Sequence, residues 1–151
     1  MPKHPYVKAS AEINAALILS NGEYFFGRGI GAKQKVVGEV CFNTSITGYQ
    51  EILTDPSYTG QIINFTAPHI GNVGCNAEDA ESAKFANGLI ICDDLTPASN
   101  FRSENDFNNW LVNKDLSGIC GIDTRHITNL IRDKGVCTAI IAFCKDGEVF
   151  N

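Results

Sequence analysis

The stretch VVGEVCFNTSITGYQEILTDPSYTGQIINF, residues 36–65, predicts the order of elements in the middle of the chain. Val36–Asn43 alternates and is rich in β-branched residues, and Gln61–Phe65 is an apolar run of strand length, so both are predicted strands. Tyr49–Leu53 predicts a short helix that stops before Asp55-Pro56, because a residue that precedes proline disfavours helical geometry. The stretch therefore predicts a strand, a short helix, a turn and a second strand.

Strand signals continue on both sides of this stretch. Ala15–Leu19 and Glu23–Phe26 flank Asn21-Gly22, a pair that readily takes the positive φ angles of a tight turn, so this segment predicts a β-hairpin. Further apolar runs of strand length are Leu89–Cys92, Gly118–Ile122 and Cys137–Phe143. Strands are therefore expected to outnumber helices.

The clearest helical signal is Thr124–Lys134. Asp123 can cap its first turn, apolar residues share one face at the i, i+3, i+4 spacing, and Gly135 follows as a left-handed stop. A second helix is predicted over Asp106–Val112. The sequence as a whole predicts a strand-rich α/β domain.

Length and composition predict one folded domain. The 151 residues suit a single domain, with a polar leader at residues 1–14 and the fold over residues 15–151. The net charge of −5, without a basic run, argues against a nucleic-acid partner. The longest apolar stretch, Val136–Cys144, is too short for a membrane helix, so we expect a cytoplasmic protein with no membrane contact.

The cysteines and histidines predict no metal site. The six cysteines sit singly, mostly in apolar surroundings, which indicates buried reduced thiols in preference to disulfides. No Cys-x-x-Cys occurs, and His4, His69 and His126 are scattered, so a zinc site would need ligands from distant parts of the chain.

Two motifs resemble chemical sites but lack the required context. Gly27–Ala32 fits the dinucleotide fingerprint, yet Lys35–Phe42 reads as a strand where a helix must begin, so the glycines are predicted to form a turn between strands. Gly118–Gly121 resembles the start of a nucleophile elbow around Cys120, but the second glycine is replaced by Ile122. A buried strand cysteine is the simpler interpretation, with His126 on the following helix.

Two loops could display binding residues. His69 lies between a proline and two glycines, where a hydrogen-bonded turn is the alternative to a binding role. Asp55-Pro-Ser-Tyr58 is a turn by composition, and it displays the Ser57 hydroxyl. Residue chemistry alone gives no acid–base pair and no phosphate loop.

Four blocks closely resemble the N-terminal half of the small, glutamine-hydrolysing subunit of carbamoyl phosphate synthetase. They are Gly38–Tyr58, Pro68–Gly74, Ala98–Arg102 and Gly121–Arg125, and the resemblance extends over Ala15–Phe143. It implies a swivelling β/β/α-type domain that helps to hold the small subunit on a large, ATP-using subunit. It also implies that the segment from Asn43 to Tyr49 and the His69 loop serve the fold and domain contacts.

The resemblance implies no catalytic residue in this chain. The family's glutaminase half carries a Cys in G-x-C-x-G-x-Q with a His and a Glu, and that motif does not occur here. In the family the D-P-S loop lies against the glutaminase site, which implies that Ser57 contacts glutamine and that Asp55, Pro56 and Tyr58 shape its loop. ATP and Mg²⁺ belong to the large subunit, so this chain is expected to bind no cofactor. The alternative is a stand-alone interaction domain without a catalytic role.

Overall fold

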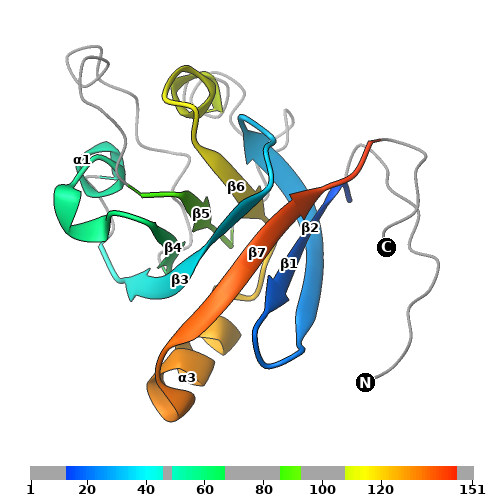
Figure 1. The fold of residues 1–151 in the computed structure, drawn as a ribbon, viewed down its shortest axis with the longest axis vertical. Helices are drawn as coiled ribbons and strands as arrows, with labels where there is room; N and C mark the ends of the chain where they lie inside the picture. Colours follow the sequence, from blue (N-terminus) through cyan, green and yellow to red (C-terminus); the bar gives the residue numbers. More distant parts are fainter. Residues whose placement is uncertain (1–12, 46–48, 67–85, 93–107, 146–151) are drawn as a thin grey trace.

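Seven strands form a closed barrel in the computed structural model, which describes residues 13–45, 49–66, 86–92 and 108–145 (Figure 1). The strands are β1 (Ala15–Leu19), β2 (Tyr24–Gly31), β3 (Val36–Asn43), β4 (Gln61–Phe65), β5 (Gly88–Ile90), β6 (Ser117–Cys120) and β7 (Cys137–Phe143). The helices are α1 (Tyr49–Leu53), the 3₁₀ turn η1 (Pro56–Tyr58) and α3 (Thr124–Lys134), and residues 108–113 are also helical.

The barrel is mixed, in the order β1-β2-β6-β5-β4-β3-β7. Strands β3, β4, β5 and β6 run parallel, whereas β1 and β7 join neighbours by antiparallel pairing. Val40 shows both modes, since it pairs with Ile62 of β4 in parallel and with Cys137 of β7 in antiparallel register. The predicted strand-rich α/β class is confirmed, and closure leaves these strands without a free sheet edge.

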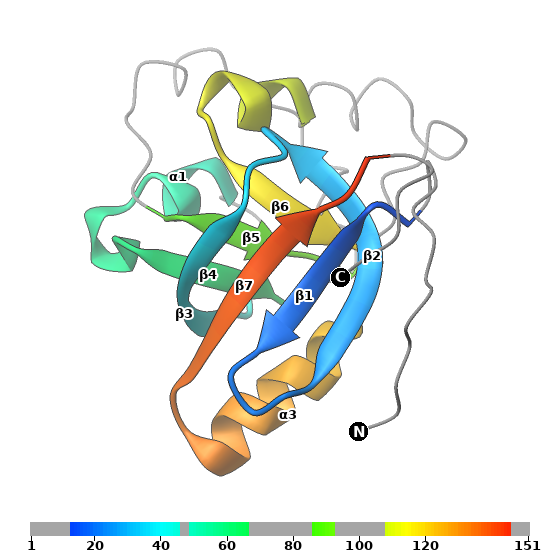
Figure 2. The same cartoon turned by 45° about the vertical axis from the view of Figure 1, so that its right-hand side comes forward.

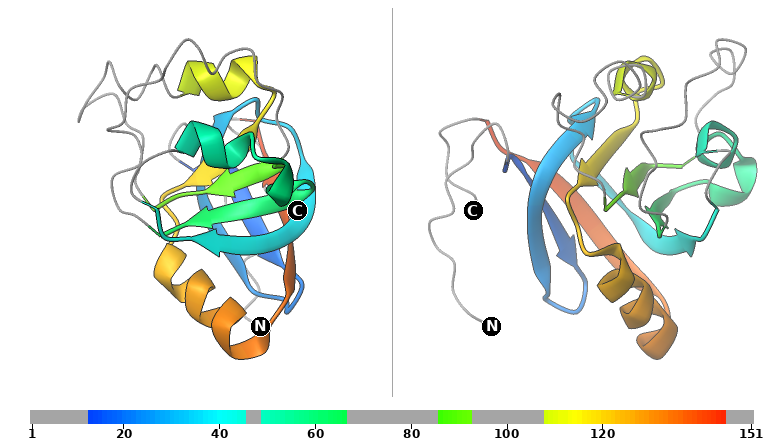
Figure 3. Two further views of the ribbon diagram at one scale, coloured as in Figure 1. Left: turned by 90° about the vertical axis from the view of Figure 1, so that its left-hand side faces the viewer. Right: turned by 180° about the vertical axis from the view of Figure 1, so that it is seen from behind.

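Apolar side chains separate into two clusters because successive residues of a strand face opposite sides. The inner cluster fills the barrel and continues under α3, which lies at one end of it (Figures 2 and 3). Its buried members are Ala15, Leu17, Leu19, Val40, Ile62, Ile90, Ile119, Ile122, Ile127, Ala139 and Ile141. In β4, Ile62 belongs to this cluster, whereas Ile63 points to the other side.

The outer cluster lies between the parallel strands and the shorter helices. Its buried members are Ile30, Leu53, Ile63, Phe65, Ala86, Leu89, Ile91, Trp110, Leu111, Leu116 and Cys120. Leu53 comes from α1, and Trp110 and Leu111 come from the helical residues 108–113. The loop that carries Ser57 therefore rests on a packed support, on the side of the barrel away from β1 and β2 (Figure 1).

The prediction of a turn at Gly27–Ala32 is wrong, because β2 continues through these glycines to Gly31. The reason lies in the packing of the barrel, where a Cβ at Gly27 would collide with the carbonyl oxygen of Cys120 on β6. The glycines thus permit close approach of two strands. The rejection of a dinucleotide site is consistent with this geometry, since β3 follows where the fingerprint requires a helix.

Local signals located several elements well. The hairpin around Gly22 is confirmed, and the Thr124–Lys134 helix is confirmed with its Asp123 cap. Asn14, which we assigned to the leader, donates its N–H to the Gly27 carbonyl oxygen at 3.0 Å and accepts from the Gly29 N–H through Oδ1. Asn14 is therefore bonded to β2.

None of the helices in the described residues is long and apolar enough to cross a membrane.

Candidate functional site

The loop between α1 and β4 holds Ser57 in a fixed backbone conformation. Asp55 caps η1, because its Oδ1 accepts the Ser57 N–H at 2.9 Å. Tyr58 donates its N–H to the Asp55 carbonyl oxygen at 3.1 Å. Thr59 donates to the Pro56 carbonyl oxygen through both its N–H, at 3.2 Å, and its hydroxyl, at 2.6 Å. The predicted turn is confirmed, and its backbone is fixed by hydrogen bonds within the loop.

The side chain of Ser57 is exposed at the surface. Among the described residues, none forms a hydrogen bond with its hydroxyl group. A hydroxyl can donate one hydrogen bond and accept two, so Ser57 presents a complete short polar group to whatever approaches this face. The loop can therefore recognise a polar ligand or a partner surface.

Tyr58 ties the loop to the end of β3. Its hydroxyl accepts a hydrogen bond from Asn43 Nδ2 at 3.0 Å, although the two residues are fifteen positions apart. Its ring packs against the outer cluster together with Ile52 and Cys41. From the sequence, Asn43 was named only as the start of a segment that serves the fold and domain contacts, and its bond to Tyr58 was not predicted. The available signal is that a half-buried tyrosine hydroxyl needs a polar partner.

Cys41 of β3 packs against the same outer cluster as Tyr58 and is unsuited to nucleophilic chemistry. Burial raises the pKa of its thiol from the usual 9.0 to about 11, and the nearby Glu39 carboxylate adds to the increase. The thiolate is the reactive form of cysteine, so a raised pKa keeps Cys41 inert near neutral pH.

Cys120 is a buried strand cysteine, as predicted. It lies on β6 with no exposed surface and belongs to the outer cluster. Gly121 follows with a φ of 77°, and the chain then enters α3 through the Asp123 cap. No substrate can reach the Cys120 sulfur in this state, so the near match to a nucleophile elbow has no catalytic consequence.

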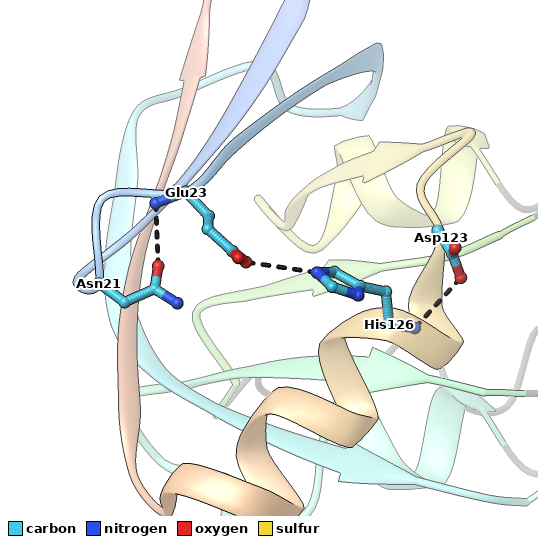
Figure 4. A network of polar contacts seen from close by, with 4 residues as sticks. All are labelled: Asn21, Glu23, Asp123 and His126. Atoms are coloured by element: carbon cyan, nitrogen blue, oxygen red, sulfur yellow. Dashed lines mark hydrogen bonds and ion pairs between the residues drawn. The ribbon is translucent and has the colours of Figure 1, made fainter. Parts of the chain in front are cut away.

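His126 joins α3 to the β1–β2 hairpin (Figure 4). Its Nε2 lies 3.3 Å from Oε2 of Glu23, and its ring meets the Phe25 ring edge-on with centroids 5.8 Å apart. The backbone N–H of His126 donates to Asp123 Oδ1 at 3.1 Å, which is the capping bond of α3. Both side chains of the His126–Glu23 pair are more than 40% exposed, so this pair is a contact between α3 and the hairpin at the protein surface.

The remaining sequence candidates are placed as follows. His69 and the blocks Pro68–Gly74 and Ala98–Arg102 lie outside the described residues. The described residues contain no group of three or more potential ligands from His, Cys, Asp and Glu that could hold a metal ion. The loop around Ser57 is thus the candidate functional site in the described part of the chain.

A family model and individual related proteins all point to the same protein family. Residues 17–141 match the family model described as the carbamoyl-phosphate synthase small chain, CPSase domain. The carbamoyl phosphate synthase small chain of Zymomonas mobilis is 51% identical over 133 residues, covering 87% of this chain and 36% of that protein. The small chain of Bradyrhizobium diazoefficiens is 50% identical over 139 residues, covering 89% and 35%.

The chain spans about a third of the length of these curated relatives. Among solved structures, an aminopeptidase from Aneurinibacillus sp. strain AM-1 aligns with a TM-score of 0.46 and 16% identity, over 95% of this chain and 32% of its own. That likeness is too distant to bear on fold or function.

Proposed function

We propose that this chain is the N-terminal domain of a carbamoyl phosphate synthase small chain and that it docks on the large chain. The chain belongs to the carbamoyl-phosphate synthase small chain family. The family match over residues 17–141 is the observation that carries this proposal. The proposed domain is of the swivelling β/β/α type and runs to residue 151. It starts at Asn14, one residue before the predicted Ala15, because Asn14 is hydrogen-bonded to Gly27 and Gly29 of β2, and the proposed leader precedes it. It works in the cytoplasm as part of a two-chain enzyme.

The whole enzyme makes carbamoyl phosphate from glutamine, bicarbonate and ATP, and it supplies arginine and pyrimidine synthesis. A separate amidotransferase half hydrolyses glutamine and passes ammonia to the large chain. ATP and Mg²⁺ are bound by the large chain, so this chain contributes no cofactor site and no catalytic residue. The buried position of Cys120 supports this division of labour, because it leaves the thiol without access to glutamine.

Ser57 is the proposed contact with glutamine. The hydroxyl is exposed, and the Asp55 carboxylate holds the Ser57 N–H. A loop that borders another domain's pocket needs a short hydrogen-bonding group on a fixed backbone, without bulk that would fill the pocket. Asp55-Pro-Ser-Tyr58 meets this requirement.

The test combines binding with complementation. Titration calorimetry measures binding of this chain to the purified large chain, and a glutaminase assay follows addition of the amidotransferase half in trans. We expect binding to the large chain, and glutamine hydrolysis only when the amidotransferase half is present. The matched control is Cys120→Ser, which should bind and complement as the parent does.

Two outcomes would contradict the proposal. Glutamate release by this chain alone that disappears in Cys120→Ser would place the nucleophile here. Absence of binding to both components, by a chain with a folded circular dichroism spectrum, would favour a stand-alone interaction domain.

A further inference from the structure

We propose that Asn43 is a positioning residue for glutamine recognition, acting through the Tyr58 hydroxyl to hold Ser57 in place. This inference rests on the proposed contact between Ser57 and glutamine. It concerns a residue at the end of β3 that lies outside the turn itself.

The hydrogen bonds of Asn43 determine which way its amide group points. Its Oδ1 accepts the Ser45 N–H at 2.8 Å, so the other end of the amide, Nδ2, faces Tyr58. The Tyr58 hydroxyl therefore accepts this bond, at 3.0 Å. Exchange of the two amide atoms would place Nδ2 against an N–H donor, which cannot accept a hydrogen bond.

The backbone of Asn43 is fixed to the barrel independently. Its carbonyl oxygen accepts the Thr66 N–H at 3.1 Å and the Thr66 hydroxyl at 3.4 Å, just beyond the end of β4. Asn43 also pairs with Phe65 in the parallel register of β3 and β4. The side chain that reaches Tyr58 thus extends from a rigid point of the sheet.

Ser57 is held from both sides by this arrangement. On one side Asp55 accepts its N–H, and on the other Tyr58 is anchored by its hydroxyl and by packing of its ring on the outer cluster. The bond between Asn43 and Tyr58 lies in a part-buried setting, where competition from water is reduced. Small displacements of a binding group weaken recognition strongly, so loss of this anchor should weaken glutamine binding at Ser57.

The experiment uses a small chain that contains both halves, assembled with its large chain. Tyr58→Phe removes the accepting oxygen and keeps the ring. We expect the KM for glutamine to rise about three- to tenfold, the range for loss of one neutral hydrogen bond, with ammonia-dependent synthesis unchanged. Asn43→Leu should raise it similarly, and the double variant should be no worse than either single one.

Asn43→Asp provides the rescue. A carboxylate can still accept the Ser45 N–H and can accept from the Tyr58 O–H, so the link is kept with its direction reversed. This variant should retain a KM near that of the parent. Tyr24→Phe, which loses the same atom on β2 across the barrel, is the matched control and should leave the KM unchanged.

A Ser57→Ala arm separates the two levels of the argument. If Ser57→Ala raises the KM and Tyr58→Phe does not, the role of Asn43 is overturned and the glutamine contact stands. If Ser57→Ala has no effect, the proposed contact itself fails. If Tyr58→Phe lowers glutamine-dependent and ammonia-dependent synthesis equally, the bond serves folding alone and the inference is overturned.

Discussion

The side-chain nitrogen of Asn64 lies 2.9 Å from the hydroxyl oxygen of Thr128, at the end of the barrel that α3 covers. The same nitrogen donates to the Thr124 carbonyl oxygen at 3.0 Å, and all three residues are buried. These bonds join the C-terminal part of β4 to the first turns of α3 within apolar surroundings. They fix how the helix sits on the barrel, because an unpaired polar group there would be costly.

Asn64→Asp should destabilise the fold by about 3 kcal/mol at neutral pH, because it buries a carboxylate without a cation and turns an oxygen toward the Thr124 carbonyl. Burial raises the pKa of such an aspartate in the folded state, so the variant's stability should be greatest in acid and fall as pH rises through that pKa. Urea unfolding at several pH values measures this.

The control for this prediction is Asn64→Leu. It removes two hydrogen bonds and also Oδ1, a buried atom with no hydrogen-bond partner in the described residues. We expect a loss of only about 1 kcal/mol, independent of pH. Equal losses in both variants at every pH would contradict the assigned orientation of the amide.

Gly31→Ala should be much more destabilising than Gly121→Ala. Both glycines have positive φ angles, 72° and 77°, so both alanine variants carry backbone strain of about 1 kcal/mol. Only at Gly31 would the new Cβ collide with the Leu116 carbonyl oxygen, whereas the space around Gly121 is open. Thermal unfolding of the two variants tests this difference, and similar melting temperatures would contradict the close approach of β2 to the segment before β6.

Cys41 should resist alkylation in the folded chain. Its pKa of about 11, against the usual 9.0, reduces the thiolate fraction at pH 8 about 100-fold, and its partial burial limits access further. Iodoacetamide labelling with peptide mass spectrometry should show the exposed Cys92 modified well before Cys41, with the difference reduced in urea. Rapid labelling of Cys41 in the folded chain would contradict this prediction.

The raised pKa of Cys41 also makes the stability of the fold depend on pH. Because the pKa is higher in the folded state, the stabilisation that depends on the neutral thiol is complete below pH 9 and is lost between about pH 9 and 11.

The Glu23–His126 pair should contribute less to stability than the helix cap beside it. Both side chains are more than 40% exposed, so Glu23→Gln should change the free energy of unfolding by less than about 1 kcal/mol. Asp123→Ala removes the acceptor of the His126 N–H and should cost about 1 kcal/mol. Chemical unfolding of the two variants at low and moderate salt compares them, and a larger loss for Glu23→Gln would contradict the ranking.

Elements with local signals could be predicted from the sequence, whereas the strand pairing could not. Thr124–Lys134 was located because Asp123 and Gly135 mark its two ends by local chemistry. The extent of β2 was missed because Gly27–Ala32 reads locally as a turn, whereas its glycines accommodate the backbone of β6. Barrel closure depends on pairing between segments such as β1 and β7, more than one hundred residues apart, which no local pattern encodes.

The candidate site shows the same division. Turn chemistry located the Asp55 cap and the display of Ser57, because both act within three residues. The bond between Asn43 and Tyr58 was not predicted, since it depends on the path of the chain from the end of β3 through α1 to η1. Turn chemistry predicted the loop, the family resemblance is the source of the proposed glutamine contact at Ser57, and only the structure showed the bond that anchors Tyr58.

Ser57→Phe in a small chain with both halves should raise the KM for glutamine by about tenfold or more, while ammonia-dependent synthesis changes little. The phenyl group would occupy the space that the proposed glutamine contact requires, and ammonia bypasses that step. We expect no folding defect, because Ser57 is exposed and its backbone N–H bond to Asp55 Oδ1 does not involve the serine hydroxyl. Steady-state assays with glutamine and with ammonia as nitrogen donor measure the two effects separately, and Thr54→Val, directly after α1, is a nearby control. Equal loss with both donors would show that the substitution disturbs the fold or the docking of the chains, and the glutamine contact would then have no support from this position.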